Sequence, residues 1–144
     1  MYIRHSERIS GKVKPEEIKL MYFGISRELL KEELTTDGSL VGTLLYLAPE
    51  SLSSLTVDHR SDIHALDVTM YELLTGKPPF TGENQVNVYY KILNTPPPPF
   101  PDDVHICIEL KEIILRCLAR GPEERFQSAG ELNKTLSALT FRDT

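Results

Sequence analysis

The sequence predicts a mainly α-helical domain that begins with a small β-hairpin. Apolar residues recur at helical spacing after Asp58, whereas short apolar stretches separated by turn residues occur near the start of the chain. The chain has 144 residues, which fits one domain, and its 40% hydrophobic content is enough to form a core. We therefore expect a single domain over residues 1–144.

The expected elements follow one another in a simple order. The hairpin occupies residues 1–23, where two apolar stretches flank a polar segment that contains turn formers. A loop covers residues 24–50, and it is polar and irregular over residues 24–42, as surface loops usually are. A helical region over residues 51–139 completes the domain.

The first predicted helix runs from Asp58 to Gly76. Asp58 is a good N-cap, and Gly76 stands where a helix commonly ends. Apolar residues cover so much of the helix surface that we expect burial on most sides. These residues are Ile63, Ala65, Leu66, Val68, Met70, Leu73 and Leu74.

Three further helices are expected after a proline-rich stop. They cover residues 84–94, residues 106–120 and a segment that opens with a capping box at Ser128 and Glu131. The proline run at residues 96–99 separates two of them; a rigid connector is favoured there over a polyproline recognition motif. The residues expected to face the core are Val86, Tyr89, Tyr90, Leu93, Leu110, Ile113, Ile114, Cys117, Leu118, Leu132, Leu136 and Leu139.

Composition limits the partners and the location that we expect. The net charge is −5, and no cluster of Lys and Arg forms the basic surface that nucleic acid requires. No apolar run approaches the roughly 18 residues that a membrane span needs, and the N-terminus lacks a signal peptide. We therefore expect a cytoplasmic protein with no nucleic-acid partner and no membrane segment. Cys107 and Cys117 are interpreted as reduced packing thiols.

Five sequence blocks give the chain a recognisable pattern. Residues 22–27 read Tyr-Phe-Gly-Ile-Ser-Arg, and residues 42–50 read Gly-Thr-Leu-Leu-Tyr-Leu-Ala-Pro-Glu. Residues 61–66 read Ser-Asp-Ile-His-Ala-Leu, residues 73–80 end in Lys-Pro-Pro-Phe, and residues 122–126 read Pro-Glu-Glu-Arg-Phe. In this order and at this spacing, the blocks resemble the C-terminal, helical lobe of bacterial serine/threonine protein kinases. The resemblance covers almost the whole chain and implies a partial, protein-kinase-like domain that lacks the catalytic loop.

The resemblance implies an activation segment, the loop whose phosphorylation often controls such kinases. Its opening resembles Asp-Phe-Gly, and its closing end resembles Ala-Pro-Glu. Hydroxyl residues within it are candidate phosphoacceptors, with plain solvated loop residues as the alternative. The activation-segment-like residues are Tyr22, Phe23, Gly24, Thr43, Ala48, Pro49 and Glu50, and the candidate phosphoacceptors are Thr35, Thr36 and Ser39.

Two structural roles are carried over from the same resemblance. Glu50 and Arg125 resemble a buried ion pair that ties the end of the activation segment to the helical floor; two unrelated surface charges are the alternative. Asp62 resembles the helix-start acid that holds the backbone of the catalytic loop; the alternative is a solvated acid that the helix dipole favours. Thr43 either faces the site of the catalytic aspartate or is an ordinary loop threonine.

The catalytic parts of the family are missing from this sequence. Phosphoryl transfer in kinases needs a Gly-rich loop, a Lys–Glu pair, a base-like Asp, and an Asn and an Asp that hold magnesium. Two alignments of residues 1–17 are conceivable, and both remove the catalytic aspartate and place Tyr22 at the metal position. A neutral phenol, with a pKa of about 10, cannot replace a carboxylate on Mg²⁺. We therefore name no catalytic residue and no metal ligand, and expect no cofactor for this chain alone, although the family uses ATP and magnesium.

Two further positions depart from the family pattern. Asp67 stands where the family usually has glycine, and it lies on the apolar stripe of the first helix, where an unpaired carboxylate would be costly. Gly121 replaces an aspartate before Pro122, which removes a cap worth about 1 kcal/mol.

Three interpretations follow from the pattern. The chain is a kinase-fold remnant or pseudokinase lobe that binds a protein partner or a missing N-lobe, without catalysis of its own. Alternatively, it is one half of a split serine/threonine kinase that another chain completes. The third interpretation is an unrelated helical module that mimics kinase motifs, and it predicts that Glu50 and Arg125 lie far apart.

Overall fold

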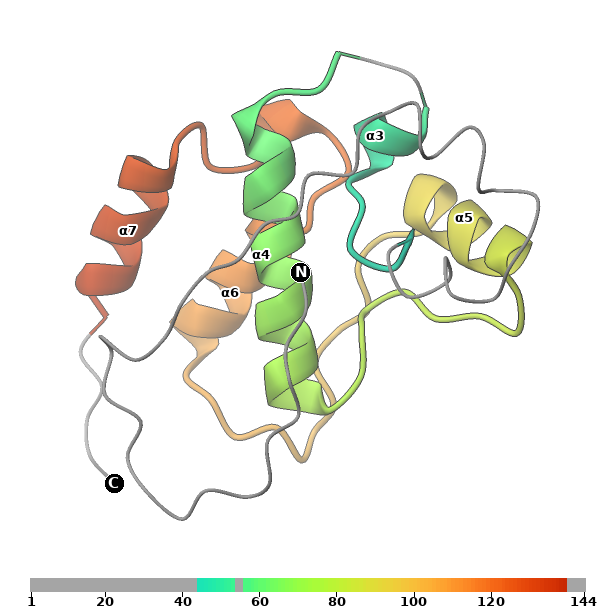
Figure 1. Ribbon diagram of the computed structural model, residues 1–144. Helices are drawn as coiled ribbons and strands as arrows, with labels where there is room; N and C mark the ends of the chain where they lie inside the picture. Colours follow the sequence, from blue (N-terminus) through green and yellow to red (C-terminus); the bar gives the residue numbers. More distant parts are fainter. Residues whose placement is uncertain (1–43, 54–55, 140–144) are drawn as a thin grey trace, which may run out of the picture. The chain divides into compact units, whose positions relative to one another are not determined.

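The described part of the chain is built from helices. The computed structural model describes residues 44–53 and 56–139, and these ranges contain helices and connecting segments but no strand (Figure 1). The predicted mainly helical fold is therefore confirmed, whereas the predicted hairpin over residues 1–23 lies outside the described residues. The elements are α3 (Pro49–Leu52), α4 (His59–Thr75), α5 (Gln85–Asn94), α6 (Ile108–Cys117), the 3-10 turn η2 (Pro122–Glu124) and α7 (Ala129–Ser137).

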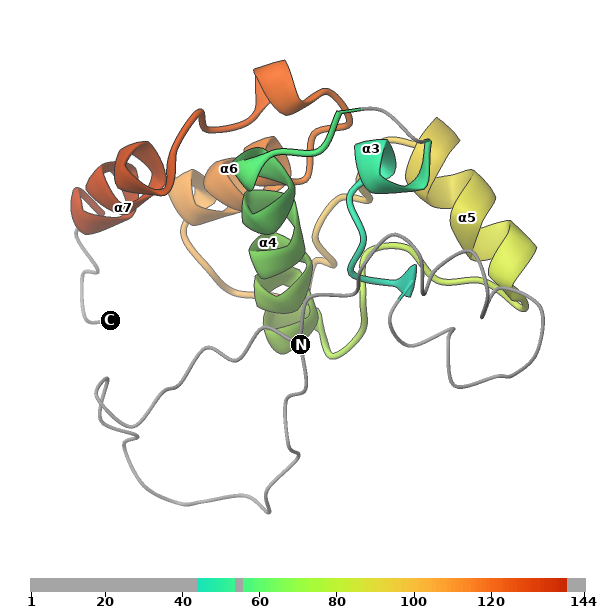
Figure 2. The same cartoon turned by 45° about the horizontal axis from the view of Figure 1, so that its top comes forward.

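α4 is the central helix, and its ends lie where the sequence predicts them. Asp58 caps its start by accepting a hydrogen bond of 2.8 Å from the backbone N–H of Arg60. Gly76 ends it at a φ of 80°, a left-handed conformation that glycine adopts without strain. Figures 1 and 2 both show α4 in the middle of the described helices, with α7 on one side and α3 and α5 on the other.

Two apolar clusters hold α4 against α6. The first extends to α7 through Leu132, and Leu136 and Leu139 pack on it as the sequence predicts. The second contains the rings of Tyr71 and Phe100, whose centroids are 4.9 Å apart. The buried members are Ile63, Ile113, Cys117, Phe126 and Leu132 in the first cluster, and Val68, Tyr71, Phe100, Ile114 and Leu118 in the second.

The buried face of α4 differs from the prediction. Leu66 and Leu73 are 36% and 68% exposed, and Met70 between them is only partly buried. His64 and Asp67 are fully buried instead. The prediction that α4 is buried on most sides is therefore wrong, because Leu66 and Leu73 lie on a stripe that no described helix covers.

The buried face of α5 is also different from the one expected. Val86, Tyr89 and Tyr90 are 74%, 39% and 62% exposed, whereas Val88 and Ile92 are buried. These two residues join a third apolar cluster with Leu44 and Phe80, through which α5 packs near α3. Val86 and Tyr90 have the same four-residue spacing as Val88 and Ile92, so spacing could not identify the buried pair.

The structure also differs from the prediction in smaller details at α6, α7 and α3. α6 covers Ile108–Cys117, so it is shorter at both ends than the predicted helix over residues 106–120. At α7, the Ser128 hydroxyl accepts from the Glu131 N–H (3.0 Å), but the Glu131 carboxylate accepts from the backbone of Gln127 (2.7 Å), so the capping box is shifted by one residue. α3 was not predicted, although Pro49 at its start is a typical first helical residue. None of the described helices has the length and apolar character needed to cross a membrane.

Candidate functional site

The candidate site centres on a buried ion pair between α3 and the segment after η2. Nη1 and Nη2 of Arg125 donate to Oε1 and Oε2 of Glu50 at 2.7 and 2.8 Å, and the two side chains are 0% and 3% exposed. The hydroxyl of Ser61 donates a further bond of 2.6 Å to Oε1 of Glu50. Burial alone would raise the pKa of Glu50, but the bonds from Arg125 and Ser61 lower it below its usual range. Glu50 is therefore held as a carboxylate.

The guanidinium of Arg125 has an acceptor for each of its five N–H groups. Besides the two bonds to Glu50, Nε donates to the carbonyl of Ala119 (2.8 Å). Nη1 donates to the carbonyl of Arg60 (3.1 Å), and Nη2 donates to that of Arg120 (2.9 Å). One side chain therefore joins α3, the start of α4 and the segment after α6.

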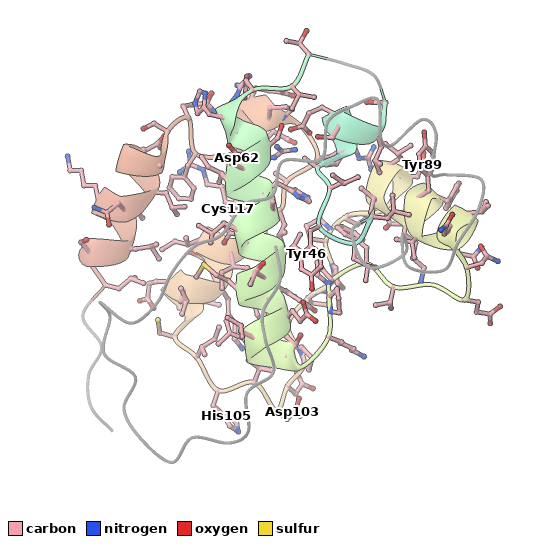
Figure 3. All side chains as sticks on the ribbon, viewed as in Figure 1. Tyr46, Asp62, Tyr89, Asp103, His105 and Cys117 are labelled. Carbon is pink, nitrogen blue, oxygen red and sulfur yellow. The ribbon has the colours of Figure 1, made fainter. Side chains whose placement is uncertain are left out.

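A second contact links the segment before α3 to α4. The hydroxyl of Tyr46 donates a hydrogen bond of 2.5 Å to Oε2 of Glu72, 26 residues later in the chain, and Figure 3 shows Tyr46 beside α4. Burial, followed by the bond to Glu72 and its charge, raises the pKa of Tyr46 to about 12. Neither residue was expected to have a role, because nothing in the local sequence pattern indicates a pairing at this separation.

Asp62 lies in the first turn of α4 and is exposed (Figure 3). Within residues 44–53 and 56–139, no side chain forms a hydrogen bond or ion pair with it. Its two predicted roles, an anchor for a catalytic loop or a solvated acid at the helix start, both stay predictions.

Several predicted site residues lie outside the described ranges. Their roles in an activation segment and as phosphoacceptors stay predictions. They are Tyr22, Phe23, Gly24, Thr35, Thr36, Ser39 and Thr43. In the part of the chain that the structure describes, no group of three or more His, Cys, Asp or Glu side chains is arranged to hold a metal ion.

An open groove of about 850 Å³ borders the ion pair. Its lining is mostly proline and aliphatic, and Arg120 is its one basic residue beside three glutamates. Such a lining does not suit a nucleotide phosphate, which favours basic groups and glycine-rich backbone. The lining residues are Pro49, Glu50, Ser53, Leu93, Pro96, Pro97, Leu115, Ala119, Arg120, Gly121, Pro122, Glu123 and Glu124.

The two departures from the kinase pattern both have structural consequences. Asp67 is 0% exposed, and its carboxyl oxygens have no hydrogen-bond partner among the described residues. At Gly121, the backbone N–H donates to the Glu124 carboxylate (3.2 Å), which provides a cap from within η2. A Cβ at this position would clash with Oε1 of Glu123, so a larger residue would have to displace that side chain.

Comparison with known proteins identifies the family. Residues 9–136 match the protein kinase domain family. The chain is 38% identical over 126 residues to the serine/threonine-protein kinase PknB of Mycolicibacterium smegmatis, an alignment that covers 85% of this chain and 20% of that protein. It is 38% identical over 122 residues to PknB of Mycobacterium tuberculosis, covering 83% of this chain and 20% of the relative.

A more distant relative gives the same result. A probable serine/threonine-protein kinase of Clostridium acetobutylicum is 36% identical over 121 residues, covering 83% of this chain and 18% of that protein. The chain thus spans about a fifth of the length of these curated relatives. The interpretation as an unrelated helical module is wrong, because the family match covers most of the chain and Glu50 contacts Arg125. This chain belongs to the protein kinase domain family, and its described part is a helical lobe similar to the C-terminal lobe of bacterial serine/threonine kinases.

Proposed function

We propose that this chain is a kinase-fold lobe that binds protein and does not transfer phosphate by itself. The observation that carries the proposal is the exposed stripe on α4. Leu66 and Leu73 are 36% and 68% exposed on the central helix of the lobe, with the partly buried Met70 between them. A central helix with an uncovered apolar stripe marks a surface that another protein segment is suited to cover.

The chemistry of the site supports the absence of independent catalysis. Tyr22 stands at the position of the metal-binding aspartate, and its phenol is a poor ligand for Mg²⁺. The groove beside Glu50 has an acidic, proline-rich lining. Neither Tyr22 nor this groove provides the carboxylates and basic groups with which kinases hold magnesium and ATP for phosphoryl transfer.

The second candidate function is one half of a split serine/threonine kinase. The fully bonded guanidinium of Arg125 favours this candidate. A buried ion pair gives an isolated lobe little more stability than well-packed apolar residues would, so stability alone does not explain the pair. A lobe that is to be completed by another chain needs the end of its activation segment held in place. In this case the partner would supply the upper lobe, the catalytic loop and the nucleotide.

A binding experiment tests the first proposal. The purified chain is mixed with the upper lobe and catalytic loop of PknB from Mycolicibacterium smegmatis, and association is measured by calorimetry. We expect a complex that is weakened at least tenfold by the double substitution L66S/L73S. The matched control is V86S/Y90S, which changes exposed apolar residues on α5 and should leave the affinity unchanged. No complex, or equal loss in both variants, would contradict the proposal.

Phosphorylation of a generic protein substrate with Mg-ATP then separates the two candidates. A complex without activity supports a binding lobe. A complex whose activity rises further with Tyr22→Asp supports a split kinase, because that change restores the carboxylate at the metal position. A complex that is inactive with both Tyr22 and Asp at this position argues against the split kinase.

A further inference from the structure

The central helix buries two ionisable side chains that no described residue pairs with. His64 and Asp67 are each 0% exposed. Nδ1 and Nε2 of His64 and both carboxyl oxygens of Asp67 have no hydrogen-bond partner among the described residues. The two residues are three positions apart and are therefore neighbours on the helix surface. A buried unpaired charge is far more costly than a buried unpaired neutral group, so the packed lobe favours the neutral form of each.

His64 is kept neutral by its surroundings. Burial and, second, the Arg125 cation lower its pKa to about 3, while the Glu50 carboxylate opposes them. All five N–H groups of Arg125 already have acceptors, so none remains for the imidazole. His64 is therefore an uncharged ring at physiological pH, and it supplies no positive charge to Asp67.

Asp67 faces α6 without a compensating charge. The titratable group opposite it is the thiol of Cys117, which lies near the carboxyl but not in the geometry of a hydrogen bond. Burial and the charge of Asp67 raise the pKa of Cys117, and they outweigh the opposing cations of Arg116 and Arg125. Within the described ranges no lysine, arginine or histidine forms an ion pair with Asp67. Loss of its proton would therefore place an isolated negative charge between α4 and α6.

We propose that Asp67 makes the contact between α4 and α6 sensitive to protons. The two helices pack together while Asp67 is a neutral carboxylic acid, and the contact loosens when Asp67 loses its proton. No added ligand is needed, because the Asp67 proton passes to and from solvent as the contact opens. The lobe would then hold α6 more tightly in slightly acidic conditions than in slightly alkaline ones.

The direction in which pH changes the stability of the contact between α4 and α6 follows from proton linkage. Burial raises the pKa of Asp67 from 3.8 to about 7 in the folded lobe. A group whose folded pKa is raised contributes stability that is complete below its unfolded pKa and is lost as the pH rises through the folded value. Because the unfolded carboxylate is already ionised at pH 6, raising the pH from 6 to 8 should increase the population with α6 opened by about tenfold.

Hydrogen exchange of the full chain measures this opening. Peptides from α6 are followed by mass spectrometry at pH 6 and pH 8, with rates corrected for intrinsic exchange and α5 as the internal reference. We expect protection of α6 to fall by about tenfold in the wild type. Asp67→Asn keeps the shape of the side chain but cannot ionise, so it should remove the loss of α6 protection that the wild type shows when the pH rises. Asp62→Asn, an exposed acid on the same helix, is the matched control and should leave the pH dependence intact.

A second measurement keeps the test decisive if the D67N variant does not fold. Carbon NMR of the wild-type chain follows the Asp67 carboxyl during a pH titration. A midpoint near 7 supports the proposal, and a midpoint near 4 overturns it. Equal loss of α6 protection in the wild type and D67N, or no change between pH 6 and pH 8 in the wild type, also overturns it.

Discussion

The hydroxyl of Tyr46 donates a hydrogen bond of 2.5 Å to the carboxylate of Glu72. This bond fastens the segment before α3 to the C-terminal part of α4, at the opposite end of the helix from the ion pair of Glu50 and Arg125. The segment from Leu44 to Leu52 is therefore attached to the helical floor at two separate points.

Tyr46→Phe removes one hydrogen bond to a charged, partly exposed acceptor. We expect the free energy of unfolding to fall by about 1 kcal/mol, measured by urea unfolding at pH 7. Because the folded lobe raises the pKa of Tyr46 to about 12, this contribution is complete below pH 10 and is lost as the pH rises through the folded pKa. Tyr89→Phe is the control, since its hydroxyl makes a longer, exposed bond of 3.3 Å to the Leu52 carbonyl. An equal loss in both variants would show that the Glu72 contact contributes nothing specific.

Arg125→Lys keeps the charge but loses the forked geometry. Lysine cannot bind both oxygens of Glu50 and the three backbone carbonyls together, so we expect a loss of about 3–5 kcal/mol in the free energy of unfolding. Arg120→Lys is the matched control, because its side chain is exposed and its carbonyl is unaffected. The measurement is urea unfolding followed by circular dichroism. A cost below about 1 kcal/mol for R125K would contradict the assignment of the pair as a structural junction.

In mildly acidic solution, below pH 6, His64 and Asp67 give opposite pH dependences of stability that largely cancel. The lowered pKa of His64 contributes stability that is complete above pH 6.5 and is lost as the pH falls, whereas the raised pKa of Asp67 contributes stability that is lost as the pH rises above 3.8. We expect Asp67→Asn to leave the His64 effect alone, so that the variant loses about 1.4 kcal/mol per pH unit on acidification from pH 6 to pH 4.5, relative to wild type.

His64→Leu should have the reverse effect over the same pH range. It leaves Asp67 as the one buried group on α4 that titrates in this pH range, so stability relative to wild type should fall as the pH rises from 4.5 to 6. Urea unfolding at several pH values measures both variants, and other groups titrate equally in all of them. Parallel pH profiles for the wild type, D67N and H64L would contradict this prediction.

Gly76→Ala tests the end of α4 without a steric clash. No heavy atom lies within 4 Å of the position that its Cβ would occupy, but the residue has a φ of +80°. We therefore expect a loss of about 1 kcal/mol that arises from the backbone conformation alone. Gly130→Ala is the matched control: it lies in α7 with ordinary space around it, and alanine should stabilise that helix by about 0.5–1 kcal/mol. Thermal unfolding of the two variants should therefore shift in opposite directions.

The sequence could predict what depends on local signals. Asp58 and Gly76 indicated the ends of α4, since a cap and a left-handed glycine act within one turn of the chain. The buried side of α5 could not be predicted, because Val86 and Tyr90 follow the same helical spacing as Val88 and Ile92. The choice between them depends on where Leu44 and Phe80 lie, and Leu44 is distant in sequence from α5.

At the candidate site, too, contacts between residues far apart in the sequence could not be predicted from local patterns. Family resemblance pointed to Glu50 and Arg125, and the structure places them 2.7 Å apart across 75 residues of chain. Spacing alone gave no reason to pair them. The position of Asp67 on the apolar stripe was visible in the sequence, but its lack of a partner depends on the packing of α6. Tyr46 and Glu72 were missed because each looks ordinary in its own segment.

Every N–H group of the Arg125 guanidinium is already bonded, so the side chain has no free donor with which to form other contacts. If α3 moved away, Arg125 would lose both bonds to Glu50 and remain as an uncompensated cation in a buried position, with three carbonyls still bound to it. Partial detachment of this short helix is therefore more costly than its four residues suggest. The end of the activation-segment-like region and the helical floor should exchange, unfold and be cut by proteases as one cooperative unit.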